Sequence, residues 1–437
     1  MRSSSPHDRE IARLAVPALG ALVAEPLYVL ADTAVVGRIS TEALAGLAIA
    51  SAALLSGFAI FIFLAYGTTA AVSRLLGADR PDEAAHQAVQ SLWLAVLIGV
   101  AVTAVGAAFA GPIIRGLAGD AAPAVIDQAL TYFRVSLAGV PFQLLVFSGT
   151  GYLRGLQDTV TPLVVAVVAA VGNLVLELVL VVGLDFGIGA SALSTVIAQG
   201  GSAAVFVGLI LRATGALHVS RRPDPRTILR LARVGGDLLV RTIALRAAVT
   251  VSTAVAARIG TVEVAAHEVV FAIWALLALA LDALAIAGQA LVGRFLGAGD
   301  GRAAREVGQR MLVLGAAFGV LLGGVLAVAS PVLPQLFTED DAVAATATTL
   351  LLVAAVSQPV NGLAFVLDGL LIGAGDLAFL AKAMVGAAAI MAVLAAVVLA
   401  ADAGIVWLWV AIGAFMAARA APLWLRWRTG AWAVTGA

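Results

Sequence analysis

The sequence predicts an all-α membrane protein with twelve transmembrane helices in two pseudo-symmetric six-helix bundles. Of its 437 residues, 62% are hydrophobic and only 12% are charged, which is more apolar than a soluble globular domain requires. Apolar runs of about 20 residues or more recur from end to end, and each is long enough to cross a hydrocarbon core of roughly 30 Å. Several motifs of the first half recur in the second, and the short alternating segments typical of a β-barrel are absent from the sequence.

Polar or glycine-rich breaks divide the chain into twelve apolar segments. Several of them are longer than a perpendicular crossing needs, so we expect tilted, kinked or projecting helices. The first follows a polar, basic start and is longer than the core of a cleavable signal, which indicates an uncleaved first helix. The expected spans are residues 11–37, 43–76, 84–111, 123–152, 161–184, 188–212, 228–258, 262–293, 303–329, 342–373, 377–401 and 404–425.

Arginine residues gather at alternate ends of these spans and predict the orientation. Arg74 and Arg80 follow the second span, and six arginines crowd the junction after the sixth. The positive-inside rule then places both termini in the cytoplasm of a plasma-membrane protein. We expect lobes at 1–212 and 228–437, joined by a cytoplasmic linker at 213–227, with a basic stretch able to contact anionic lipid.

An internal repeat relates the two halves. Within AAVSRLLGADRPDEAAHQ (70–87) and QALVGRFLGAGDGRAARE (289–306), Arg74 and Leu76 align with Arg294 and Leu296. The segment PFQLLVFSGTGYLRGLQD (141–158) aligns with PVNGLAFVLDGLLIGAGD (359–376) at nearly the same offset. Because six is an even number, the halves have parallel topology, as in transporters that place the substrate site between two repeats.

The first span carries an aspartate, Asp32, where apolar side chains would be less costly. An ionisable group near the bilayer centre usually faces a protein interior or a water-filled cavity. Glu25 lies seven residues earlier, on the same helical face, and is a further candidate for cation coupling. Pro26 removes a backbone hydrogen bond and should kink the helix. We therefore expect a switching helix with a titratable face.

The fifth span offers a partner for Asp32. Asn173 and Glu177 are four residues apart and share a face. At about 1.5 Å rise per residue, Asp32 and Glu177 lie at similar depths, about 9 Å and about 12 Å from the outer ends of their helices, so they can meet. Two carboxylates in a low dielectric do not both stay ionised, so such a pair binds H⁺ or Na⁺. The alternative is a protonated acid that only hydrogen-bonds neighbouring helices.

The second half lacks these acids. At the matching positions it has Ser252 for Asp32 and Ala395 for Glu177. The sequence therefore predicts a cation site in the first lobe only.

Four stretches resemble the multidrug and toxic compound extrusion (MATE) family: VLADTAVVGR, GYLRGLQDTVTPL, GNLVLELVLVVG and AAHEVVFAIWALLALALDALAIAGQALVGR. The last of these resembles the family's DinF-like branch. The resemblance implies two six-helix bundles around a V-shaped cavity, and export driven by inward flow of H⁺ or Na⁺. It places Asp32, Asn173 and Glu177 on the family's acidic and asparagine positions of helices 1 and 5.

The same resemblance places Asp368 near the acidic position of helix 10. The acid that some branches carry in helix 7 is missing here, and that span instead holds Arg241 and Arg246. An ion pair with Asp282 or Asp368 is the favoured role for these arginines, and contact with an anionic part of a substrate is the alternative.

Further polar and aromatic residues inside the spans are candidates for lining a substrate cavity. For each, hydrogen bonding or packing between helices is the competing interpretation. The candidates are Tyr28, Gln143, Asp282, Gln289, Gln358, Asn361, Asp368, Arg241 and Arg246.

Taken together, the sequence predicts a monomeric secondary exporter of small organic solutes, cationic or amphiphilic, without cofactor or metal beyond a possible Na⁺ at Asp32, Asn173 and Glu177. A flippase for lipid-linked sugars is the alternative. Zero net charge gives no indication of nucleic acid, and the absence of cysteine removes thiolate chemistry. The only lysine, Lys382, does not fit a phosphate-binding loop, so neither an enzyme nor a primary pump is expected.

Overall fold

The computed structural model describes residues 6–436. All the regular structure in this range is helical, and twelve helical stretches are long and apolar enough to cross a membrane. This confirms the twelve predicted spans, and most boundaries agree within a few residues. The described chain divides into two compact units, one formed by residues Gly20–Gly235 and the other by the residues before Gly20 together with those from Gly236 onward.

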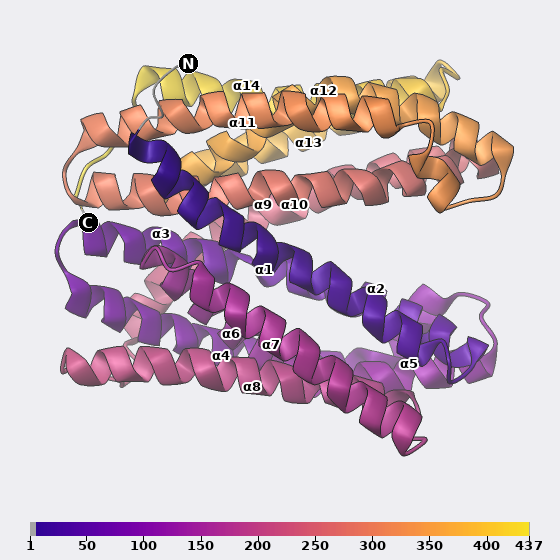
Figure 1. The fold of residues 1–437 in the computed structure, drawn as a ribbon, viewed down its shortest axis with the longest axis horizontal. Coiled ribbons are helices and arrows are strands. Elements are labelled where there is room, and N and C mark those ends of the chain that lie inside the picture. The colour runs from indigo at the N-terminus through magenta and orange to yellow at the C-terminus, as the bar shows by residue number, and fades with distance from the viewer. Residues whose placement is uncertain (1–5, 437) are drawn as a thin grey trace. The chain divides into compact units, whose positions relative to one another are not determined.

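The first unit contains most of the first helix and the seven helices after it (Figure 1). Its central helix is α6, which packs against α3, α4 and α8. The helices are α1 (Pro6–Val36), α2 (Thr41–Phe61), α3 (Phe63–Gly77), α4 (Pro81–Ala118), α5 (Pro123–Ser136), α6 (Val140–Gly155), α7 (Val160–Glu177) and α8 (Ile188–Ala216).

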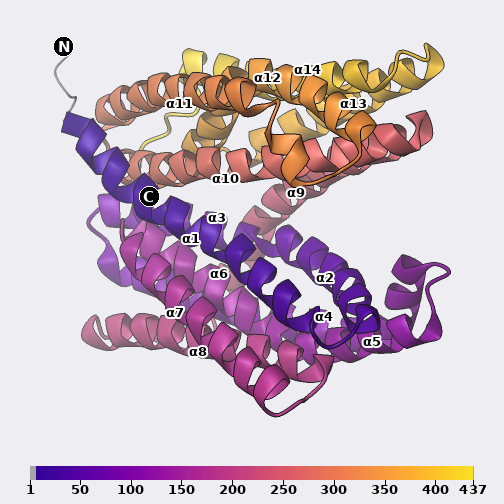
Figure 2. The ribbon, with the colours of Figure 1, turned by 45° about the vertical axis from the view of Figure 1, so that its right-hand side comes forward.

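The second unit is built around α12, which lies alongside α10, α11 and α14 (Figure 2). It contains α9 (Pro225–Ile259) from Gly236 onward, α10 (Thr261–Gly297), α11 (Gly301–Ala329), α12 (Asp341–Gly373), α13 (Leu377–Ala400) and α14 (Ile405–Thr429). Short 3₁₀ turns lie at Leu137–Gly139 (η1) and Leu333–Leu336 (η3), and α7 continues into a π-helical turn, Leu178–Gly183 (η2).

Glycines at repeat-related positions set the closest helix contacts in both units. In α6, a Cβ added at Gly151 or Gly155 would meet the α3 backbone at Ala65 or Thr69. In α12, a Cβ at the equivalent glycines would meet the α10 backbone at the equivalent residues: Gly369 against Ala285, and Gly373 against Gln289. These pairs keep the register of the two aligned segments, so the internal repeat extends to backbone packing. Small residues allow such close approach between membrane helices.

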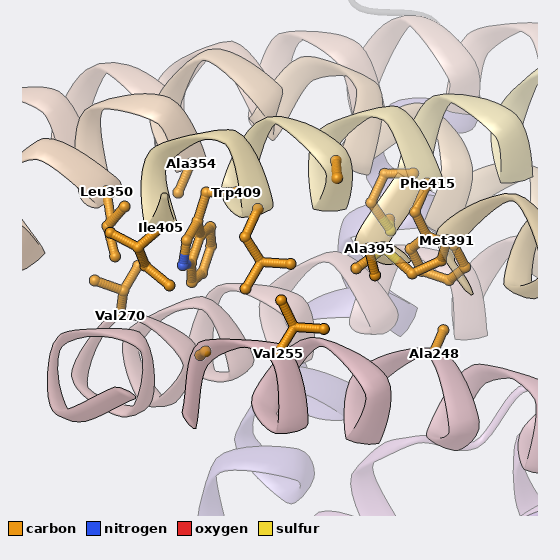
Figure 3. Close-up of a cluster of buried hydrophobic side chains, with 14 of the residues drawn as sticks. Ala248, Val255, Val270, Leu350, Ala354, Met391, Ala395, Ile405, Trp409 and Phe415 are labelled. Carbon is orange, nitrogen blue, oxygen red and sulfur yellow. The ribbon is translucent and has the colours of Figure 1, made fainter. Parts of the chain in front are cut away.

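The core of the second unit is a cluster of buried apolar side chains from α9, α10, α11, α12, α13 and α14 (Figure 3). Ala248 and Val255 point into it from α9, and Trp409 enters it from α14. Ala395, the counterpart of Glu177, is 1% exposed in this cluster. An apolar core therefore surrounds the counterpart of Glu177, while Ser252, the counterpart of Asp32, is buried as a polar residue outside this cluster.

The segment before α9 is held against α4. Trp93 Nε1 donates to the Arg221 carbonyl at 3.0 Å, and Gln90 Nε2 donates to the Arg222 carbonyl at 3.0 Å. The Thr227 hydroxyl donates to Asp224 at 2.6 Å and lowers the pKa of that carboxyl. The predicted linker thus contains an ordered turn that packs on the first unit.

Candidate cation site and buried ion pairs

Asp32 is buried in the first unit, with 4% of its surface exposed. The Tyr132 hydroxyl of α5 donates to Asp32 Oδ2 at 3.2 Å. The Ser191 hydroxyl, in the first turn of α8, lies 3.0 Å from Asp32 Oδ1. Helices from three parts of the chain therefore meet at this carboxyl group, which has polar neighbours rather than lipid.

Glu177 lies in the same cluster and is fully buried. Its Oε1 is 2.7 Å from the Ser191 hydroxyl, so one serine bridges the two acids. The structure thus brings Asp32 and Glu177 together.

The local sequence explains how Glu177 and Ser191 come to face each other. Glu177 is the last α-helical residue of α7, and a π-helical turn follows it. Asp185 has a positive φ of 54° in the loop that ends this turn, a conformation that aspartate adopts more readily than most residues. The chain then reverses, and α8 begins at Ile188, which carries Ser191 back toward α7.

Two oxygen atoms of this cluster have no partner among residues 6–436. They are Asn173 Oδ1, one turn before Glu177, and Glu177 Oε2. Buried polar atoms without partners are costly, so such atoms suit a ligand. Oxygen-rich sites bind hard cations, and a carboxyl pair binds a proton. The arrangement is therefore able to take up either H⁺ or Na⁺.

The other predicted residues of the first unit are Tyr28, Glu25, Pro26 and Gln143. The Tyr28 hydroxyl is 3.4 Å from Thr195 Oγ1, one turn of α8 beyond Ser191. Glu25 is exposed and makes no ion pair in the described chain. The helix α1 continues without interruption through Pro26. Gln143 is half-buried on α6.

The second unit holds a buried ionic cluster at Asp368. This residue of α12 is 3% exposed, and its Oδ2 is bonded by Arg241 of α9 and by Arg419 of α14. The Arg419 guanidinium also lies over the Phe365 ring, 4.9 Å from its centroid. The ion pair favoured for Arg241 is therefore present in the structure.

Sequence reasoning missed Arg419 altogether, and it also missed Ser191 and Tyr132. Arg419 is 2% exposed, and it lies only seven residues before Arg426, among the basic residues that end the last span. The sequence carried little signal, since the long side chain of an arginine one to two turns inside a span can reach the membrane interface.

The remaining candidates for the substrate cavity are Asp282, Gln289, Gln358, Asn361 and Arg246. Asp282 is half-buried on α10 and acts electrostatically on Arg419. Gln289, Gln358 and Asn361 are each 2% exposed or less. Both amide atoms of Gln358 lack a hydrogen-bond partner within residues 6–436. Arg246, by contrast, is exposed.

Comparisons with known proteins extend over both units. A family model described as MatE matches residues 17–179 and 240–398. Protein DETOXIFICATION 44, chloroplastic, of Arabidopsis thaliana is 33% identical over 436 residues, which cover 97% of this chain and 83% of that protein. DNA damage-inducible protein F of Escherichia coli (strain K12) is 28% identical over 439 residues, which cover 97% and 94%.

A solved structure described as MATE in the bent conformation has the same fold. It superposes with a TM-score of 0.88 at 20% sequence identity, and the match covers 98% of this chain and 95% of that one.

Proposed function

Because this chain belongs to the MatE family of multidrug and toxic compound transporters, which are not enzymes, we propose that it is a secondary active exporter driven by H⁺ or Na⁺. Its substrates are small organic solutes, cationic or amphiphilic. It works as a monomer in the plasma membrane with both termini in the cytoplasm. The flippase alternative is not favoured, because the relatives are DETOXIFICATION proteins and DNA damage-inducible protein F.

The observation that carries the proposal is the Asp32–Glu177 pair bridged by Ser191. A buried pair of acids joined by one hydroxyl changes its hydrogen bonding whenever it gains or loses a cation. Asp32 is on α1 and Glu177 is on α7, so uptake of an ion favours one relative position of these helices. This gives the ion a different affinity for two conformations, which is what coupling requires.

The proposed cycle begins with H⁺ or Na⁺ entering the pair from the outside. Neutralising the pair lets α1 bend at Pro26, where the helix lacks a backbone hydrogen bond. The bend lowers the affinity for solute, which leaves to the outside. The ion is then released to the cytoplasm, fresh solute binds, and the transporter returns to its starting state.

Transport into inside-out vesicles under separately imposed proton and sodium gradients tests this function. The Asp32→Asn variant keeps the size of the side chain and removes its charge, so gradient-driven transport should fall roughly tenfold or more. Asp127→Asn makes the same substitution at an exposed aspartate of α5 and should transport as the wild type does. Gradient-driven export by Asp32→Asn at the normal rate would exclude the carboxyl pair as the coupling site.

A further inference from the structure

The two arginines inside α9 have different surroundings. Arg241 is buried and bonded to Asp368, whereas Arg246, five residues later, is exposed and makes no ion pair with any residue of 6–436. Building on the proposed function, we propose that Arg246 binds an oxyanionic group of the transported solute, such as a carboxylate. Among organic solutes, those that carry such a group, including zwitterions, are then preferred over purely cationic ones.

The orientation of α9 turns Arg246 away from the protein core. Ala248 and Val255 point into the apolar cluster of the second unit (Figure 3). At about 100° per residue, Arg246 lies about 200° around the helix from Ala248 and about 180° from Val255. It therefore occupies the opposite face of α9, so packing does not hide its charge.

From Arg246 toward the outer end of α9, this face does not have the composition of a lipid-facing surface. Its exposed residues there include Ala247, Thr250 and Ala254. The exposed large apolar residues in the described part of α9, such as Val240 and Ile243, all precede Arg246, and others, such as Val320 and Val393, lie on α11 and α13. Helix faces in contact with lipid carry large apolar side chains, so the part of this face beyond Arg246 adjoins water.

The depth of Arg246 supports the same conclusion. It lies 13 residues before the end of α9 at Ile259, about 20 Å along the helix and so near the middle of a 30 Å hydrocarbon core. A charged residue at that depth almost always faces a protein interior or a water-filled passage. Since Arg246 is exposed rather than buried, it faces water that crosses the membrane region.

The acids of the second unit do not neutralise this charge. Asp368 is engaged by Arg241 and Arg419, and Asp282 acts on Arg419. Glu268 is exposed on α10, seven residues from its outer end at Thr261, so it lies about 10 Å nearer the outside than Arg246. An arginine keeps its charge at every accessible pH, and its planar fork matches a carboxylate with two parallel hydrogen bonds.

The internal repeat places Arg246 and Asp32 on equivalent helices of different halves. In the register that aligns Arg74 with Arg294, Arg246 and Ser252 of α9 correspond to Pro26 and Asp32 of α1. One repeat therefore keeps an acid for the coupling cation, and the other keeps a base on its water-facing side. A solute bound through an oxyanion at Arg246 does not compete with the cation for the same charged group.

A matched pair of dyes tests this recognition. The probes are a zwitterionic rhodamine with a free carboxylate and the ethyl ester of the same dye, titrated onto the purified full-length protein by fluorescence anisotropy. We expect the wild type to bind the free acid about tenfold more tightly than the ester, because only the acid accepts charge-assisted hydrogen bonds. Arg246→Gln should remove that preference and leave ester binding unchanged.

Two further variants separate charge recognition from structural damage. Arg246→Lys keeps the charge and should recover part of the preference. Arg258→Gln removes an exposed arginine at the outer end of the same helix and should keep all of it. Equal binding of both dyes by the wild type, which needs no variant, would overturn the proposal. So would an equal loss of both dyes in a folded Arg246→Gln protein.

Export of the two dyes by the wild type under imposed ion gradients distinguishes this proposal from the proposed function. Preferential binding of the acid without gradient-driven export of either dye would leave the anion site standing and reject the antiport. Gradient-driven export of the ester without any preference for the acid would support the antiport and reject the role of Arg246.

Discussion

Ser191 has one hydroxyl hydrogen and two acidic neighbours. Its oxygen is 3.0 Å from Asp32 Oδ1 and 2.7 Å from Glu177 Oε1. When both acids are ionised, the Ser191 hydroxyl can donate its single hydrogen to only one carboxylate. The other carboxylate then faces a lone pair of the serine oxygen. With one acid protonated, that acid donates to Ser191 while Ser191 donates to the other. The hydroxyl therefore links the protonation of one helix to the hydrogen bonding of another.

Replacing Ser191 with alanine should weaken coupling without removing either acid. We expect gradient-driven export by Ser191→Ala to fall roughly tenfold, because a hydrogen bond to a charged group contributes about 1.5–3 kcal/mol. Ser194→Ala is the matched control: Ser194 is also fully buried on α8, but its hydroxyl donates to the Ser191 carbonyl within the helix. Equal loss of export in both variants would assign the effect to packing of α8 instead.

The residues found and missed by sequence reasoning differ in a physical way. Asp32 and Glu177 stood out because a carboxylate inside an apolar run carries a large desolvation cost. Ser191 and Tyr132 gave no such signal, because hydroxyl groups occur in membrane helices at little cost. Glu25 shares a helical face with Asp32, yet two turns separate them by about 10 Å, so the two acids meet different neighbours.

At the scale of elements, glycine spacing determines which helices lie closest together. Gly369 of α12 packs on the α10 backbone at Ala285, and Gly151 of α6 packs on the α3 backbone at Ala65. The obstacle in each case is main chain, which cannot rotate away as a flexible side chain can. Both glycines therefore allow the two helix backbones to approach closely, because glycine has no side chain.

An alanine at Gly369 should destabilise the protein by about 1–3 kcal/mol, the usual cost of forcing an extra methyl group into a packed interior. Gly151→Ala should have a similar cost, because the repeat places it in an equivalent contact. Thermal unfolding in detergent micelles measures both. Gly386→Ala is the control, since a Cβ at Gly386 of α13 meets no atom within 4 Å. If Gly369→Ala were as stable as Gly386→Ala, the proposed close contact between α10 and α12 would be wrong.

These elements also show how much of the secondary structure the sequence patterns can predict. Length and hydropathy were enough to place the twelve spans, because a bilayer fixes the minimum length of an apolar helix. The breaks inside them were not predictable: α2 gives way to α3 at Ile62, and α7 ends in a π-helical turn after Glu177. Such breaks depend on tertiary packing, which composition does not encode.

At the scale of the whole molecule, α1 contains residues of both compact units, because the boundary between the units falls between Leu19 and Gly20. Its later part carries Asp32. Its beginning is joined to the second unit by two ion pairs: Asp8 binds Arg310 through two hydrogen bonds of 2.6 and 2.7 Å, and Glu10 binds Arg294 at 2.8 Å. One continuous helix therefore connects the candidate cation site to the second unit.

If α1 transmits the effect of ion binding, loosening its beginning should impair coupling more than folding. Half-exposed ion pairs contribute only about 0–1 kcal/mol to stability, so Asp8→Arg should remain folded. We expect its gradient-driven export to fall roughly two- to tenfold, and the swapped pair Asp8→Arg with Arg310→Asp to recover it, because the swap restores the attraction at this contact. Gradient-driven transport in vesicles and unfolding in micelles, measured on the same preparations, separate the two effects.

Arg80→Gln breaks an ion pair with Glu83 at the start of α4 and serves as the control for loss of a surface pair. Transport that stays normal in Asp8→Arg, or a double variant no better than the single one, would show that α1 does not transmit ion binding through its first turns.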